Sequence, residues 1–166
     1  VHRFLHLVSL EQDLADSRIV AEVINELVAQ GKLQQAEAKL INPEVVARFF
    51  ATDLGQMILA AGTQVEREVP FALALPEQTA WGDEDLIVVR GIIDMILPSP
   101  QGLVIVDFKT DNVAPEDVPY YAQRYLAQVN YYAQGLTRIR QSPVAAGYLA
   151  FLTSGVNFPV PILSRT

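Results

Sequence analysis

The sequence predicts an α/β protein in which a mixed central sheet is flanked by helices and preceded by a helical N-terminal region. Apolar residues recur at helical spacing over the first sixty residues, whereas the next three apolar runs have the pattern of strands. A helical segment and another apolar run follow. Hairpin-linked strands followed by a helical crossover predict a sheet with both antiparallel and parallel neighbours.

The helices of the N-terminal region are delimited by their end signals. Asn42 before Pro43 is typical of a helix start, because proline tolerates the first helical position. Gly31 and Gly62 are typical stops. The expected helices span residues 18–28, 33–41 and 43–62.

The strands of the second region are bounded by turn-forming residues. Pro70 marks the first as an edge strand, since proline cannot donate to a central ladder. The third is apolar on both faces, which predicts a central position. The expected strands span 63–75, 86–97, 103–109 and 144–152, with connections at 76–85, 98–102 and 111–119 and a helix over 120–139.

Length and composition limit the class of protein. The 166 residues can bury a core, so we expect one domain with a helical part, 1–62, and a core part, 63–166. The first residue is Val1 and no signal-peptide pattern follows, which favours a fragment of a longer chain. No run approaches eighteen apolar residues, so no membrane span is expected, and a cytoplasmic location is consistent with the composition.

Charge and cysteine content exclude several sites. With no cysteine, the chain cannot form a disulfide, an iron–sulfur cluster or a cysteine-based zinc site. The net charge of −7 disfavours independent DNA binding, because such domains are usually basic. It does not disfavour a carboxylate-based metal site.

Two acidic residues stand in apolar surroundings. Asp94 lies inside a long apolar strand and Asp107 ends the next one. A buried carboxylate is costly unless it is paired or bound to a metal. The hairpin can bring the two carboxylates side by side, and a divalent cation would relieve their repulsion.

Lys109 follows Asp107 by two positions, so both side chains should project to one face while Phe108 points into the core. Two carboxylates, a metal and an ammonium suit phosphodiester hydrolysis, with the lysine steadying water or developing charge. The alternative is a structural Asp–Lys ion pair at a strand end.

Three motifs in order resemble one nuclease family. They are Gly91-Ile92-Ile93-Asp94, Val106-Asp107-Phe108-Lys109-Thr110 and Gln128-Val129-Asn130-Tyr131-Tyr132. Together they resemble the G-x-x-D, D-[YF]-K-T and Q-x-x-x-Y motifs of the RecB-like branch of the PD-(D/E)xK nucleases. The resemblance implies a restriction-endonuclease-like core and a metal-dependent DNA exonuclease.

The resemblance also implies residue roles. His2, on a helix before the first strand, would be a third metal ligand beside Asp94 and Asp107, and the backbone carbonyl of Phe108 would complete the set. The metal would be Mg²⁺, with Mn²⁺ as a possible substitute. Gln128 and Tyr132 would support the catalytic residues, and Tyr132 could alternatively meet DNA phosphate. Gln128 and Tyr132 share one helix face. The surrounding aromatic residues could stack on bases or form the helix–sheet seam: Tyr120, Tyr121, Tyr125 and Tyr131.

The similarity extends to AddA-type (RexA-type) nuclease domains. It includes an E-x-P-F strand beginning at Glu68, whose role stays open between shaping the site and lying exposed on an edge strand. For an intact protein it implies an upstream ATP-driven helicase, an AddB-like (RexB-like) partner subunit, and processing of double-strand breaks for recombinational repair. A catalytically silent relative, which guides DNA or docks another protein, is the alternative; a small-molecule metal phosphohydrolase is disfavoured by the lack of further His/Asp clusters.

Overall fold

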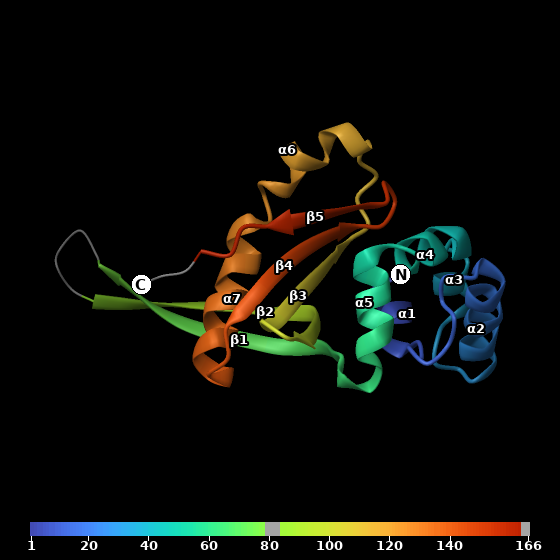
Figure 1. Cartoon of the computed structure of the whole chain (residues 1–166), viewed down its shortest axis with the longest axis horizontal. Helices are drawn as coiled ribbons and strands as arrows, with labels where there is room; N and C mark the ends of the chain where they lie inside the picture. The colour runs from blue at the N-terminus through green and yellow to red at the C-terminus, as the bar shows by residue number, and fades with distance from the viewer. Residues whose placement is uncertain (79–83, 164–166) are drawn as a thin grey trace.

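The computed structural model describes residues 1–78 and 84–163 of the chain. Its helices form two groups, one before the sheet strands and one between them (Figure 1). The first group comprises α1 (His2–Leu7), α2 (Ser17–Ala29), α3 (Gln35–Ala38), α4 (Pro43–Phe50) and α5 (Asp53–Ala61), followed by the 3-10 turn η1 (Gly62–Gln64). The second comprises the 3-10 turn η2 (Pro115–Asp117), α6 (Val118–Ala122) and α7 (Leu126–Arg140).

The sheet has five strands in the order β1-β2-β3-β4-β5. The β3–β4 pair is parallel and the other pairs are antiparallel, which confirms the predicted mixed sheet and the central position of β3. The α7 crossover between β3 and β4 produces the parallel pair. The strands are β1 (Glu66–Gln78), β2 (Glu84–Ser99), β3 (Gly102–Lys109), β4 (Val144–Phe151) and β5 (Val156–Val160).

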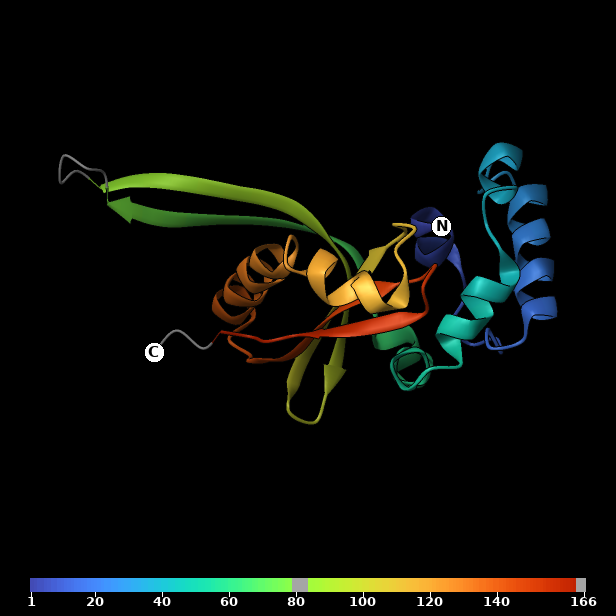
Figure 2. The same cartoon turned by 90° about the horizontal axis from the view of Figure 1, so that it is seen from above.

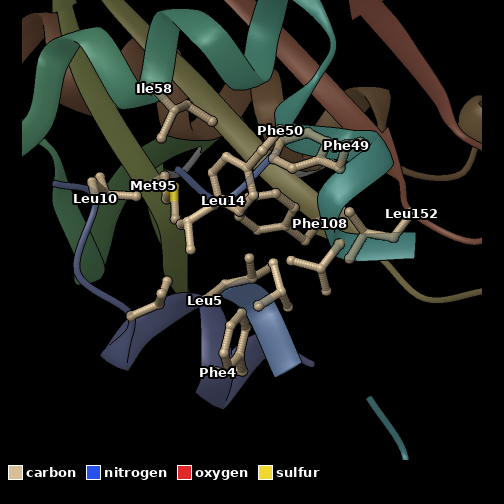
Figure 3. Close-up of a cluster of buried hydrophobic side chains, with 14 of the residues drawn as sticks. Phe4, Leu5, Leu10, Leu14, Phe49, Phe50, Ile58, Met95, Phe108 and Leu152 are labelled. Atoms are coloured by element: carbon tan, nitrogen blue, oxygen red, sulfur yellow. The ribbon is translucent and has the colours of Figure 1, made fainter. Parts of the chain in front are cut away.

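Two apolar cores lie on opposite faces of this sheet. The first core packs α1, α2, α4 and α5 against alternate residues of β2, β3 and β4, including Val106 and Phe108 (Figure 3). The second core packs α6 and α7 against the other face, including Ile93 and Ile105. The sheet is therefore covered on both sides, which explains why residues Val104 to Phe108 of β3 are all buried.

Two predicted helices are broken in the structure. The helix expected over 43–62 divides at Ala51–Thr52 with a bend of 82°. The Thr52 hydroxyl accepts from the Gly55 N–H at 3.1 Å and so caps a new helix. The helix expected over 120–139 begins earlier, at Val118, and breaks between α6 and α7.

Other predicted boundaries also change. The helix expected over 33–41 is reduced to the single turn α3. The sequence did not predict β5, whose Pro159 lies on an edge strand that needs no further partner. The predicted connection 76–85 is shorter than expected, because β1 and β2 continue into it; residues 79–83 lie outside the described residues.

β1 and β2 continue past the rest of the sheet as a two-stranded ribbon, which extends away from the N-terminal helices (Figure 2). The prediction of a mostly buried β2 was therefore wrong for residues 88–92. There Val88 is 51% exposed and Ile92 is 56% exposed, because no layer covers that face of the ribbon.

In the described part of the chain no single helix is long and apolar enough to cross a membrane, although the bent pair Pro43–Phe50 and Asp53–Gln64 meets the length and composition criteria together.

Candidate nuclease site

Asp107 and Lys109 lie at the end of β3 on the face of the second core. Asp107 is only 3% exposed, and Lys109 Nζ lies 2.6 Å from its Oδ2. This short contact is a buried ion pair. The buried Asp107 carboxylate is held by the Lys109 ammonium, and carboxylate oxygens are ligands that divalent cations accept.

Asp94 reaches the site through a break in strand alternation. Ile93 belongs to the second core and Met95, two positions later, to the first core. Regular alternation would place both on one face. The ladder between β2 and β3 pairs Met95 with Val106 and does not continue to Asp94. Instead, Asp94 Oδ2 accepts a 2.8 Å hydrogen bond from the Phe108 N–H.

The same break occurs opposite Asp94 on β1. The β1–β2 ladder pairs Arg67 with Met95 and Val69 with Ile93, and omits Glu68. Glu68 has a φ of 48°, a left-handed conformation that is uncommon for residues other than glycine. Its carboxylate lies 3.6 Å from His6 Nδ1 of α1. The two interrupted positions thus face each other and direct two carboxylates toward α1.

His2 is delivered by α1. The helix is anchored in the first core by Phe4, which is fully buried, and Leu5, which is 2% exposed. His2 Nε2 lies 3.0 Å from the Phe108 carbonyl oxygen and 3.8 Å from Asp94 Oδ2. His2, Asp94 and Phe108, which are far apart in the sequence, are therefore brought together as expected for neighbouring metal ligands.

The site is organised around the Phe108 peptide. Asp94 and His2 contact its N–H and carbonyl from the α1 side, and Asp107 and Lys109 flank it on β3. Two carboxylates, an imidazole and a carbonyl are donor types that suit a divalent cation. Within residues 1–78 and 84–163, however, no three His, Cys, Asp or Glu side chains already form a metal-binding cluster, and Asp107 is turned to Lys109.

Burial dominates the electrostatics of Asp94. Desolvation raises the pKa of Asp94 above its usual value, the hydrogen bond from Phe108 N–H opposes this, and the nearby Asp107 carboxylate raises it further. The charges of His2 and Lys109 lower the pKa by smaller amounts. A buried carboxyl group whose pKa is raised by burial and by a neighbouring carboxylate is typical of functional sites.

Gln128 and Tyr132 support β2. Tyr132 is 3% exposed, and its hydroxyl donates to the Ile92 carbonyl at 3.1 Å, two residues before Asp94. Gln128 Nε2 donates to the same hydroxyl at 2.8 Å. The buried Tyr132 therefore acts on the backbone that leads to Asp94. This geometry favours the supporting role over the expected alternative of contact with DNA phosphate.

Sequence reasoning missed two contributors. The Tyr125 ring lies under Lys109, with Nζ 3.8 Å from its centroid, a cation–π contact that holds the ammonium in place. A Cβ at Gly91 would lie 2.5 Å from the Tyr132 hydroxyl, so the glycine allows the tyrosine to approach β2. Gly91 opens the first recognised motif and Tyr125 lies three residues before the third, but their contacts are set by tertiary packing.

Comparisons with known proteins agree with this geometry. The family model of the PD-(D/E)XK nuclease superfamily matches residues 1–157. The chain is 37% identical over 150 residues to an ATP-dependent helicase/nuclease subunit of Levilactobacillus brevis, which covers 86% of the chain and 12% of that protein. It is 35% identical over 159 residues to the protein of the same name from Lacticaseibacillus casei, covering 93% of the chain and 13% of that protein.

A similar relative from Moorella thermoacetica, of the same name, is 32% identical over 167 residues, covering 93% of the chain and 12% of that protein. The chain thus spans about an eighth of the length of these curated relatives. Nearly all of its length is matched by both the family model and the relatives. The chain therefore belongs to the PD-(D/E)XK nuclease superfamily.

Proposed function

We propose that residues 1–166 form one nuclease domain that hydrolyses DNA phosphodiester bonds as an exonuclease with a divalent cation, Mg²⁺ or in its place Mn²⁺. The observation that carries the proposal is the convergence of Asp94 and His2 on the peptide of Phe108, beside Asp107 and Lys109. The helical part belongs to the same functional unit because it supplies His2 through α1.

The cation would be held by Asp94, Asp107, His2 and the carbonyl oxygen of Phe108. When bound, it supplies Lewis-acid polarisation of the phosphate and a more acidic water. The burial of Asp107 and its electrostatic repulsion with Asp94 support cation binding, because a cation would offset both the desolvation and the repulsion. A neutral His2 imidazole can contribute a lone pair.

Lys109 would stabilise negative charge that develops on the phosphate. Its side chain is only 13% exposed, so the ammonium acts in a partly desolvated site where such a charge is most effective. Asp107 and the Tyr125 ring both contact the ammonium. Gln128 and Tyr132 would act as positioning residues, because they fix the Ile92 carbonyl and hence the path of β2 toward Asp94.

For the whole protein we propose the context that the relatives' name indicates. Each is named as a subunit of an ATP-dependent helicase/nuclease, and the chain covers only 12–13% of each, which supports DNA as substrate and a helicase on the same, longer polypeptide. We propose that this protein lies in the cytoplasm. A second subunit of AddB (RexB) type and a role in processing double-strand breaks for recombination complete the proposal. An adjacent helicase would compensate for the domain's net charge of −7.

The test is cleavage of linear single-stranded DNA by the 166-residue chain, with Mg²⁺, Mn²⁺ or chelator, beside Asp107→Ala and Lys109→Ala. Lys39→Ala removes an exposed lysine at the end of α3 and serves as the matched control. We expect metal-dependent cleavage by the wild type and Lys39→Ala, and a loss of two or more orders of magnitude in the other variants. A circular strand should resist an exonuclease.

Metal titration by calorimetry separates the alternatives. A silent DNA-guiding or docking module would show neither cleavage nor divalent-metal binding, and that pair of results would overturn the proposal. Metal binding that Asp107→Ala abolishes, without cleavage, would assign the metal site and overturn independent activity. Cleavage of circular and linear strands at equal rates would replace the exonuclease with an endonuclease.

A further inference from the structure

Aromatic and cationic side chains continue from Lys109 onto the surface of α6. The Tyr125 ring carries the Lys109 ammonium, and Tyr121 lies on the same edge of the second core. The Tyr121 ring is contacted edge-to-face by Tyr120, with centroids 5.9 Å apart. Tyr125 thus contacts the buried ion pair, and Tyr121, four residues earlier in the chain, contacts Tyr120 at the protein surface.

Tyr120 is the most exposed tyrosine among the large exposed hydrophobic residues of the described chain. It is 72% exposed, whereas Tyr131 on α7 is 37% exposed. Its only aromatic contact there, with Tyr121, is nearly perpendicular, at 81°. Tyr121 therefore contacts the Tyr120 ring, while most of the surface of Tyr120 remains exposed to solvent. A ring held in this way can stack on a planar partner at a small entropic cost.

Arg124 supplies a cation beside this ring pair. Its guanidinium lies 4.7 Å from the Tyr121 centroid, and it is exposed. Stacking on Tyr121 orients the guanidinium plane but leaves its N–H groups available for phosphate oxygens. Glu116 and Asp117, which are exposed in η2 just before α6, would repel phosphates. The charge distribution therefore favours a strand path past Arg124 toward Lys109.

We propose that Tyr120 and Arg124 form a binding surface for single-stranded DNA next to the nuclease site, with Tyr120 stacking on a base and Arg124 pairing with a phosphate. The proposal rests on the proposed nuclease function and goes beyond its motifs, since neither residue belongs to them. Base-on-aromatic stacking together with cationic contacts to the backbone is how proteins bind single strands without a sequence requirement. Bases within a duplex are inaccessible to Tyr120, so this surface selects unpaired DNA.

The experiment measures the dissociation constant of a fluorescent oligothymidylate by anisotropy, with chelator present so that cleavage does not interfere. Tyr120→Ala is expected to weaken binding about tenfold, and Tyr120→Phe to keep most of the affinity. An abasic oligonucleotide of the same length provides the decisive comparison. On that strand Tyr120→Ala should cause no further loss, because no base remains to stack.

Arg124 is tested through salt dependence. Loss of one phosphate contact to a single strand should reduce the slope of log affinity against log salt by about 0.7 in Arg124→Ala, and Arg124→Lys should restore it. Tyr131→Ala is the matched aromatic control and should leave affinity within about twofold of the wild type, a difference typical of peripheral contacts.

Several outcomes would overturn the proposal. They are equal effects of Tyr120→Ala and Tyr131→Ala, an effect of Tyr120→Ala that persists on the abasic strand, or tight duplex binding that depends on Tyr120. Failure of the nuclease proposal is a separate result, because cleavage is measured with metal. Binding that depends on Tyr120 in a chain that does not cleave would support this surface and overturn only the activity.

Discussion

β3 and β2 bring their acidic residues to the same site by different means. On β3, strict alternation sends Val104, Val106 and Phe108 into the first core and leaves Asp107 on the opposite face. On β2, alternation breaks at Asp94, opposite a Glu68 with positive φ. Asp107 is placed by regular strand geometry, and Asp94 by an interruption that spans two strands.

The two strands therefore contribute differently to stability. The regular geometry of β3 stabilises the fold, whereas the irregular backbone around Asp94 is formed at a cost in stability. The regular part is stabilised by burial on both faces of β3. Around Asp94 the strand ladder is interrupted, and Glu68 opposite adopts an unfavourable positive φ. Two hydrogen bonds replace the lost contacts, from the Phe108 N–H to Asp94 and from the Tyr132 hydroxyl to the Ile92 carbonyl. We therefore expect mutations on β3 to affect stability most, and mutations around Asp94 to affect the site more than the fold.

The largest effect is expected from Phe108→Ala. The ring is 3% exposed and packs edge-to-face against Phe49, with centroids 5.3 Å apart. Its removal should lower the free energy of unfolding by about 3–5 kcal/mol in urea denaturation. Ile105→Ala, fully buried on the opposite face, is the control. Where both remain folded, Phe108→Ala should impair cleavage more; equal impairment would contradict the central role of the Phe108 peptide.

A second test asks whether Tyr132 holds the irregular part of β2. Gly91→Ala forces a Cβ against the Tyr132 hydroxyl and should cost about 1–3 kcal/mol of unfolding free energy. Tyr132→Phe alone removes the hydrogen bond to Ile92 and should cost about 0.5–1.5 kcal/mol. In the double variant the 2.5 Å contact disappears and only ring carbons at 3.2 Å remain, so chemical denaturation should show a smaller loss than the sum. Additive losses would show that the two positions act independently.

The sequence predicted β3 better than it predicted the surroundings of Asp94. The buried run before Asp107 is a local pattern, and any regular strand with that pattern places Lys109 beside Asp107. The break at Asp94 and the position of α1 depend on contacts between distant residues, such as His2 with Phe108. The family resemblance identified His2, and the structure brings it to the site; its role as a ligand stays a prediction.

The same limit applies to the second group of helices. The break between α6 and α7 has no strong signal in composition, because the aromatic run from Tyr120 to Tyr132 is compatible with one long helix. The break determines which tyrosine lies under Lys109 and which is exposed. Local periodicity predicts the elements, but tertiary packing decides which of these aromatic residues are accessible to a ligand.

A third test measures how the stability of Asp94→Asn and Asp16→Asn variants depends on pH, with chelator present. Because burial raises the folded-state pKa of Asp94 above 3.8, its ionisation destabilises the fold. Asp94→Asn should be more stable than the wild type at neutral pH, and this advantage should shrink as the pH falls through the folded pKa and vanish below 3.8. Thermal unfolding across pH measures it; a constant advantage would contradict the titration of Asp94.

Asp16 is the matched control with the opposite sign. Hydrogen bonds from Arg18 lower the pKa of Asp16 to about 2. Its ionised form therefore stabilises the fold above the unfolded value of 3.8, and this stabilisation is lost as the pH falls toward about 2. Asp16→Asn should accordingly be less stable than the wild type at neutral pH. The two variants should thus depart from the wild type in opposite directions.

The smallest effect on stability is expected at Glu68. Comparing stability with cleavage there distinguishes backbone strain from a role in the site. Glycine tolerates a φ of 48°, so Glu68→Gly should raise the free energy of unfolding by up to about 1 kcal/mol. Gln141→Gly, at a φ of 50° after α7, is the control and should show a similar gain. If Glu68 shapes the site through His6, Glu68→Gly should gain stability and lose cleavage, whereas Gln141→Gly should change stability alone. Unchanged cleavage in both would mean that the strained backbone at Glu68 serves only to turn Asp94 toward α1.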